Sequence, residues 1–214
     1  HLRHRHRRET ADDQKTVTVS DQKGEVSEMT DQNRTAIGLL VDRSGSMARI
    51  KDDMEGGLRA FLDAQKDAPG EADLTHAEFD GRYLMKGALQ PLDATISINP
   101  RGSTALHDAM GRFITEFGEI LAALPEDSRP GKVIVVTVTD GEENSSREWT
   151  AEQVRALVTQ QRDVYSWEFV FLGANQDAVL TAAALGIARG STLTYNTSRV
   201  GTQSTTASLS RYVT

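Results

Sequence analysis

The strongest constraint on the fold of this chain is a pair of apolar runs, Ala36–Val41 and Val133–Thr139. Both are rich in Val, Ile and Leu and lack polar alternation, which is typical of strands covered on both faces in a parallel sheet. Each run is followed directly by an aspartate, Asp42 or Asp140. Because ligands of open α/β sheets bind beyond the carboxyl ends of the strands, the two carboxylates are expected at one edge.

Segments with helical periodicity separate these strands. Apolar residues recur at helical spacing after Ser46 and from Leu106 to Leu124, and the second stripe is expected to be core. The runs Ala72–Phe79 and Tyr83–Leu89, joined at Asp80-Gly81, predict an antiparallel edge hairpin. We therefore predict a three-layer, Rossmann-like α/β fold with a mostly parallel central sheet, one antiparallel edge strand and helices on both faces. The later predicted elements are a helix from Ala151, a strand Phe169–Leu172, a helix Asp177–Leu185 and an edge strand Leu193–Tyr195.

The chain of 214 residues suits one such domain with a tail at each end. Residues 1–33 begin with alternating His and Arg and continue without an apolar period, so we expect a disordered or extended polar leader. The domain is assigned to residues 34–199. The Ser/Thr-rich residues 200–214 are expected to form a weak final helix or a tail.

Composition excludes several classes of function. A net charge of -7 argues against nucleic acid as the main partner, since phosphate binding needs a basic face. No stretch is apolar enough to span a membrane, and no hydrophobic segment follows the basic start as in a secretory signal. The absence of cysteine excludes disulfides, thiolate zinc sites and cysteine nucleophiles. We expect a cytoplasmic protein, with association with a virus particle as the alternative.

A candidate metal site follows from the placement of five oxygen-bearing residues. Asp42, Ser44 and Ser46 alternate on one tight turn after the first strand. Such hard oxygens suit Mg²⁺ or Mn²⁺, although Ser and Asp at this place also commonly cap helices. Thr104, at the start of the long helix, and Asp140 should reach the same edge. The convergence of three separate segments is more specific than any one of them.

Four further side chains are candidates for a partner-binding rim around this site. Arg43 lies inside the first motif and either contacts an acidic group of a partner or faces solvent. Glu142 and Glu143 follow Asp140 and either tune the site, with a general base as one role, or form a solvated acidic loop. His107 is placed on the long helix near the site, with an ordinary surface histidine as the alternative.

These motifs resemble the metal-ion-dependent adhesion site of the von Willebrand factor type A domain. The matching segments are Asp42-Arg43-Ser44-Gly45-Ser46, Thr104 within Gly102-Ser103-Thr104-Ala105, and Asp140 within Thr139-Asp140-Gly141-Glu142. The resemblance covers about residues 34–197, and the compact size is similar to that of small stand-alone bacterial and phage members. It implies that the hydroxyls of Ser44, Ser46 and Thr104 approach the metal, while Asp42 and Asp140 hold it partly through water.

A site of this kind is expected to bind and not to catalyse. Neutral hydroxyl ligands leave Mg²⁺ much of its positive charge, so an Asp or Glu side chain of another protein can complete the site. The amino end of the helix expected near Ser46 would favour that anion. The predicted function is therefore non-enzymatic, divalent-metal-dependent capture of an acidic side chain on a partner protein.

Three alternatives stay open at the level of sequence. One is a structural or assembly component of a phage particle or bacterial complex, in which the terminal arms dominate. Another is an adaptor of an AAA-type ATPase, as several bacterial relatives are. The third, a Mg²⁺-dependent phosphohydrolase, would need a second Asp where this chain has Ser44. A serine nucleophile would need a histidine base, and His76 is expected within a strand. A dinucleotide site is disfavoured, because no Gly-x-Gly-x-x-Gly follows the first strand.

Overall fold

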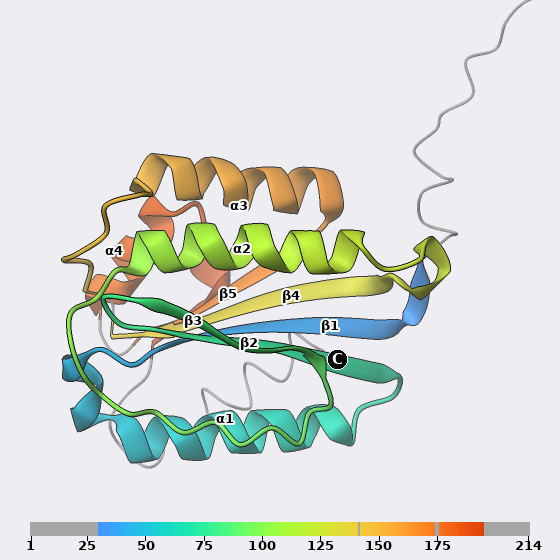
Figure 1. Cartoon of the computed structure of the whole chain (residues 1–214), viewed down its shortest axis with the longest axis horizontal. Coiled ribbons are helices and arrows are strands. Elements are labelled where there is room, and N and C mark those ends of the chain that lie inside the picture. The colour runs from blue at the N-terminus through green and yellow to red at the C-terminus, as the bar shows by residue number, and fades with distance from the viewer. Residues whose placement is uncertain (1–29, 141, 174–175, 195–214) are drawn as a thin grey trace, which may run out of the picture.

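A single six-stranded sheet, with strand order β3-β2-β1-β4-β5-β6, forms the centre of the domain (Figure 1). The computed structural model describes residues 30–140, 142–173 and 176–194, so most of the predicted leader and all of residues 200–214 lie outside the described residues. The strands are β1 (Asp31–Asp42), β2 (Glu71–Phe79), β3 (Tyr83–Gln90), β4 (Pro130–Thr139), β5 (Glu168–Gly173) and β6 (Thr192–Thr194). The α-helices are α1 (Lys51–Lys66), α2 (Leu106–Ala122), α3 (Ala151–Tyr165) and α4 (Gln176–Ala184).

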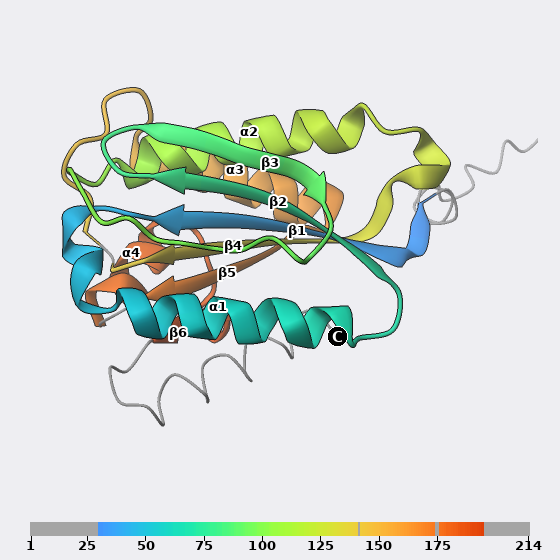
Figure 2. The same cartoon turned by 60° about the horizontal axis from the view of Figure 1, so that its bottom comes forward.

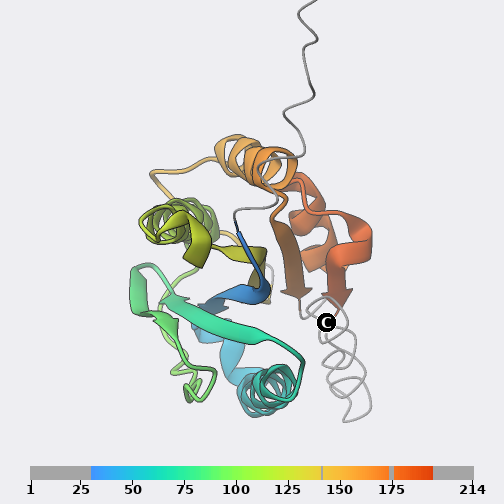
Figure 3. The same cartoon turned by 90° about the vertical axis from the view of Figure 1, so that its right-hand side faces the viewer.

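The predicted architecture is confirmed. Every pairing in the sheet is parallel except that of β2 with β3, which form the predicted edge hairpin. Figure 2 shows the arrowheads of β1 and β2 on the same side and that of β3 on the opposite side. Helix α1 packs on one face of the sheet, and α2, α3 and α4 pack on the other, which the end-on view of Figure 3 shows as three layers.

The first strand begins at Asp31, earlier than the predicted Ala36 and inside the segment assigned to the leader. Its polar entry is held by long-range contacts that an apolar pattern does not reveal. Arg34 pairs with Asp73 on β2 at 2.6 Å, and the N–H of Asp31 donates to the carbonyl of Arg129 at 2.8 Å. Among the helices of the described ranges, none is both long and apolar enough to cross a membrane.

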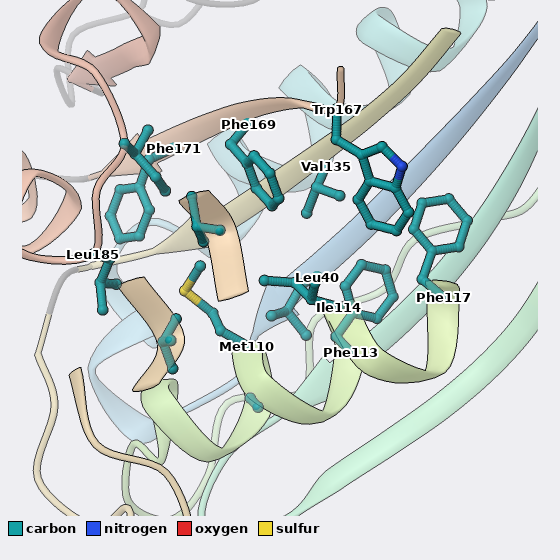
Figure 4. Packing of buried hydrophobic residues seen from close by; sticks show 14 of the residues in the cluster. Leu40, Met110, Phe113, Ile114, Phe117, Val135, Trp167, Phe169, Phe171 and Leu185 are labelled. Carbon is teal, nitrogen blue, oxygen red and sulfur yellow. The ribbon is translucent and has the colours of Figure 1, made fainter. Parts of the chain in front are cut away.

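The expected core role of the α2 stripe is confirmed by its packing on β1 (Figure 4). Phe113 and Phe117 are fully buried and stack with ring centroids 5.6 Å apart, and Phe117 meets Trp167 edge-on at 5.4 Å. A Cβ at Gly38 would lie 2.8 Å from the Phe117 ring, so the absence of a side chain on β1 allows α2 to approach this closely. This packing fixes α2, and with it the loop that carries Thr104, over the centre of the sheet.

The strand register brings three carboxyl ends to one edge. Phe79 of β2 pairs with Asp42 of β1, and Val41 pairs with Val138 of β4. Asp80 directly follows Phe79, and Asp140 lies two residues beyond Val138, so the two aspartates follow the strands on either side of Asp42. Neighbouring strands lie about 4.8 Å apart, so side chains from the three strands meet within a small volume.

Candidate metal centre

Asp42 is the buried centre of the site. Its carboxylate is fully enclosed, with Oδ1 accepting the backbone N–H of Ser44 at 2.6 Å and Oδ2 accepting the hydroxyl of Thr139 at 2.7 Å. Burial raises the pKa of Asp42 to about 6; the two hydrogen bonds oppose this rise, and the negative charge of Asp140 adds to it. A cation at this edge would relieve the cost of burying the two carboxylates of Asp42 and Asp140.

The two serines of the first motif face one another. Their hydroxyl oxygens lie 3.1 Å apart, with Ser44 buried and Ser46 half-buried. Ser44 occupies the N-cap position of a short 3₁₀ helix, Gly45–Arg49, yet its side chain makes no capping hydrogen bond. Helix capping, the alternative explanation for this serine, is therefore not its role.

The helix expected near Ser46 begins later. The chain first makes the 3₁₀ turn, and α1 starts only at Lys51. The N–H groups next to Ser46 therefore belong to this five-residue 3₁₀ helix and not to the first turn of α1, and the contribution of a helix amino end to anion binding at Ser46 stays a prediction.

Thr104 is buried and is held by its backbone to the loop after β4. Its N–H donates to Oδ1 of Asn144 at 2.9 Å, and its carbonyl accepts the N–H groups of Asn144 at 3.0 Å and Ser145 at 3.1 Å. These three bonds join the second predicted motif to the third.

The same segment is joined to the first motif on its other side. The N–H of Arg101 donates to the carbonyl of Arg43 at 2.8 Å, and that of Gly45 donates to the carbonyl of Gly102 at 3.2 Å. Gly102 has a φ of +70°, a left-handed conformation that favours glycine. The N–H of Ala105 bonds to the carbonyl of Asp80 at 3.0 Å. These backbone hydrogen bonds join the segments that carry the three motifs at one edge of the sheet.

Asp140 supplies the most informative atom of the cluster. The residue is buried, and its Oδ1 has no hydrogen-bond partner within the described part of the chain. An unpaired buried carboxylate oxygen is costly, and a cation or its water would satisfy it.

The donor set fits a hard divalent cation. Among the described residues, no group of three His, Cys, Asp or Glu side chains could hold a metal. A metal at this edge therefore depends on the hydroxyls of Ser44, Ser46 and Thr104 besides the carboxylates of Asp42 and Asp140. All of these atoms are oxygens, which suits Mg²⁺ or Mn²⁺ better than a soft metal.

The candidate rim residues take different places. The guanidinium of Arg43 is buried, with Nη1 at 3.0 Å from Oε2 of Glu78 and Nε at 3.1 Å from Oδ2 of Asp80. Its charge is therefore engaged inside the domain. Glu142 is exposed, in keeping with a solvated position. His107 lies on α2 as predicted, with its Nδ1 at 3.7 Å from Oε2 of Glu143.

Glu143 is occupied by bonds within the chain. Its carboxylate accepts the N–H of His107 at 3.0 Å, those of Ser145 and Ser146 at 2.9 and 2.8 Å, and the Ser146 hydroxyl at 2.7 Å. Burial alone would raise the pKa of Glu143, but these hydrogen bonds lower it below its usual value. With its oxygens so engaged, Glu143 serves to position the loop.

Sequence reasoning missed two residues that shape this loop. Asp108, in the first turn of α2, accepts the consecutive N–H groups of Arg147, Glu148 and Trp149 at 2.9, 2.8 and 2.8 Å. Asn144 binds Thr104 as described above. The sequence offered two signals, the polar run after Asp140 and an acidic residue in the first turn of a helix. Neither signal indicates which residues Asn144 and Asp108 bind.

Comparison with known proteins supports the fold. No protein-family model and no curated protein matches the chain. Among solved structures, proximal thread matrix protein 1 of the mussel byssus superposes with a TM-score of 0.63 at 14% identity, over 85% of this chain and 46% of the mussel protein. The pilus adhesin SpaC of Lactobacillus rhamnosus GG matches with a TM-score of 0.62 at 14% identity, over 84% of this chain and 30% of SpaC.

A third similar structure is manganese-loaded TRAP of Plasmodium vivax, with a TM-score of 0.52 at 16% identity, over 72% of this chain and 64% of TRAP. Another structure of the mussel protein has a zinc-occupied metal-ion-dependent adhesion site motif. These neighbours are von Willebrand factor A domain proteins, and the chain has the von Willebrand factor type A fold. It spans less than half the length of the mussel protein and of SpaC.

Proposed function

We propose that this chain is a divalent-cation-dependent protein-binding module. Its cation, Mg²⁺ or Mn²⁺, would be held by Asp42, Ser44, Ser46, Thr104 and Asp140, and its ligand is an acidic side chain of another protein. The observation that carries the proposal is the buried, unpaired Oδ1 of Asp140 beside buried Asp42 and the facing Ser44–Ser46 hydroxyls. The metals recorded in the mussel protein and in TRAP support a divalent cation at this edge of the fold.

The roles of the residues follow from their surroundings. Both oxygens of Asp42 already accept protein hydrogen bonds, so Asp42 contributes mainly charge and orientation. Asp140 keeps a free oxygen, and the serine hydroxyls contribute neutral donors. When bound, the cation supplies positive charge and an open coordination position. Because the hydroxyls are neutral and both oxygens of Asp42 are engaged in protein hydrogen bonds, an acidic side chain from outside would supply a further anionic ligand beside Asp140.

Binding without catalysis is supported by the state of the candidate bases. Glu143 is fully engaged in hydrogen bonds to the loop and to α2, and His107 faces Glu143. His76 is buried within β2, where burial lowers its pKa to about 4. The similar mussel matrix protein and pilus adhesin also fit a non-enzymatic role.

Calorimetric titration of the chelator-stripped protein with Mn²⁺ and Mg²⁺ tests the metal site. We expect saturable binding by the wild type, loss of binding in Asp140→Ala, and unchanged binding in Asp127→Ala, a control on the short helix Glu126–Ser128 that precedes β4. Excess acetate should raise the apparent metal affinity, because a ligand that binds only the loaded site favours loading. A folded wild type that binds neither metal, with or without acetate, would refute the proposal.

A further inference from the structure

The charged residues around the proposed metal site differ between its β2 side and its β4 side. On the β2 side lie Glu78 and Asp80, and on the β4 side lies exposed Glu142. Two carboxylates on the β2 side meet three cations: Arg43 and Lys86 at Glu78, and Arg43 and Arg101 at Asp80. This network therefore carries one excess positive charge, although the whole chain is acidic, with a net charge of -7.

Two cations of this network reach the surface, Lys86 at the middle of β3 and Arg101 beside Asp80, and Arg101 is the more exposed. The side chain of Arg43 is only 7% exposed, whereas that of Arg101 is 64% exposed. The Nε atom of Arg101 donates to Oδ2 of Asp80 at 3.1 Å, so the base of the guanidinium is anchored. An exposed guanidinium fixed in this way is prepared to accept a carboxylate in its fork of N–H donors.

Arg101 also lies close to the proposed metal ligands. Its backbone N–H donates to the carbonyl of Arg43, which is between Asp42 and Ser44 in sequence. Asp80, to which its side chain binds, directly follows Phe79, and Phe79 pairs with Asp42 in the sheet. With neighbouring strands about 4.8 Å apart, the Asp80 carboxylate that anchors the guanidinium and the carboxylate of Asp42 are on the order of 5–10 Å apart. Acidic side chains one or two residues apart in an extended segment span such a distance.

We infer that Arg101 forms a second anionic subsite on the β2 side of the metal site, and that the partner presents two nearby acidic side chains. This inference rests on the proposed function, because it takes the first acid to be at the metal. Arg101 then sets the direction of the bound segment. Its second acid lies toward β2, away from Glu142, whose like charge disfavours the opposite orientation.

Two capped peptides of equal length test the inference on the Mn²⁺-loaded protein. One has a single glutamate in a Gly/Ser background, and the other has a second glutamate two positions away. Their dissociation constants are measured from the Mn²⁺-induced relaxation of the glutamate γ protons. The variants are Arg101→Gln, Arg101→Lys and the control Arg59→Gln, which removes an exposed positive charge from α1.

The wild type should bind the two-glutamate peptide about four- to tenfold more tightly, a statistical factor of about two multiplied by one exposed ion pair. In Arg101→Gln this preference should fall to about twofold, with the affinities for Mn²⁺ and the one-glutamate peptide unchanged. Arg101→Lys should keep part of the preference, and Arg59→Gln should keep all of it.

An unchanged preference in Arg101→Gln would overturn the second subsite. Equal weakening of the binding of both peptides in Arg101→Gln would also overturn it, because Arg101 would then act on the acid at the metal. Failure of the proposed function looks different. In that case the wild type binds no Mn²⁺, or binds Mn²⁺ but neither peptide.

Discussion

Thr104 and Asn144 bind each other twice. Oδ1 of Asn144 accepts the N–H of Thr104 at 2.9 Å, and the N–H of Asn144 donates to the carbonyl of Thr104 at 3.0 Å. This pair joins the segment before α2 to the loop after β4. Asn144 is not one of the proposed metal ligands, yet it connects the segment that carries Thr104 to the loop that follows Asp140.

Asn144→Ala should weaken metal binding without removing a ligand. Loss of the Oδ1 acceptor leaves the N–H of buried Thr104 unpaired, which costs about 1–3 kcal/mol and allows Thr104 to shift. We expect Mn²⁺ affinity to fall about 10-fold, the lower range for loss of an outer hydrogen-bond partner in a metal site. Calorimetric titration measures the effect. The control is Asn33→Ala, a change at an exposed position of β1, and equal affinities in the two variants would refute a positioning role.

The Asp108 carboxylate should make the loop stable above acidic pH. Burial alone would raise the pKa of Asp108, but the N–H groups of Arg147, Trp149 and Glu148 lower it below 3.8. Because the folded pKa is the lower one, this stabilisation is present above the unfolded pKa and is lost as pH falls through the folded value. The protection factors of the amides of residues 147–149, which correct hydrogen exchange for its intrinsic pH dependence, should therefore be high at pH 7 and should fall as pH drops below the unfolded pKa of about 3.9.

The matched change is Asp108→Asn, which keeps the shape but cannot accept all three N–H groups. We expect faster exchange of these amides at pH 7 and a loss of stability of about 1–2 kcal/mol in urea unfolding. Slow exchange that persists in the variant would show that the loop is held by the Glu143 contacts instead.

Asp42 should reduce the stability of the metal-free protein at neutral pH. Its folded pKa, about 6, is above the ordinary value of 3.8, so between these two pH values the folded state holds a proton that the unfolded state releases. The sign is therefore opposite to that of Asp108. The contribution of Asp42 is most favourable below pH about 4 and is lost as pH rises through about 6.

The test is Asp42→Asn in the presence of a chelator. At pH 8 the variant should be more stable than the wild type by about 2 kcal/mol in urea unfolding, and the difference should shrink toward pH 4. The same variant should bind Mn²⁺ far more weakly, so stability and metal affinity move in opposite directions. The quantity to compare is the free energy of unfolding of the variant minus that of the wild type. A smaller difference at pH 8 than at pH 4 would contradict this account.

Local patterns predicted the order of the strands and placed the candidate site residues at one edge of the sheet, and the reason is physical. An uninterrupted apolar run such as Val133–Thr139 has no polar face to expose, so it forms a strand that is covered on both faces of the sheet. The carboxyl ends of parallel strands then lie at a common edge. The direction of a polar side chain beyond that edge depends on its neighbours instead. Arg43 turns inward because Glu78 and Asp80 of β2 are there to receive it, and residues 78–80 are far from it in sequence. The role of Asp108 is equally non-local, since its partners lie 39–41 residues away.

Gly38→Ala tests whether the close contact between β1 and α2 sets the layer spacing. The added Cβ would lie 2.8 Å from Cε1 of Phe117 and 3.0 Å from Cε1 of Phe113, and both rings are fully buried. The Phe117 ring packs against Phe113 at 5.6 Å and against Trp167 at 5.4 Å, so it cannot withdraw without disturbing these rings. We expect a loss of about 1–3 kcal/mol from overpacking, measured by urea unfolding. Because α2 carries Thr104 at its entry, Mn²⁺ affinity should fall as well.

The matched control is Gly56→Ala on α1. A Cβ there meets nothing within 4 Å, and the position is exposed inside a helix, so alanine should stabilise the protein by about 0.5–1 kcal/mol. The two substitutions add the same methyl group and should change stability in opposite directions. If both stabilise, the rings over Gly38 have room to move, and α2 is not held by this contact. If only Gly38→Ala lowers Mn²⁺ affinity, the packing of α2 on β1 is coupled to the geometry of the site.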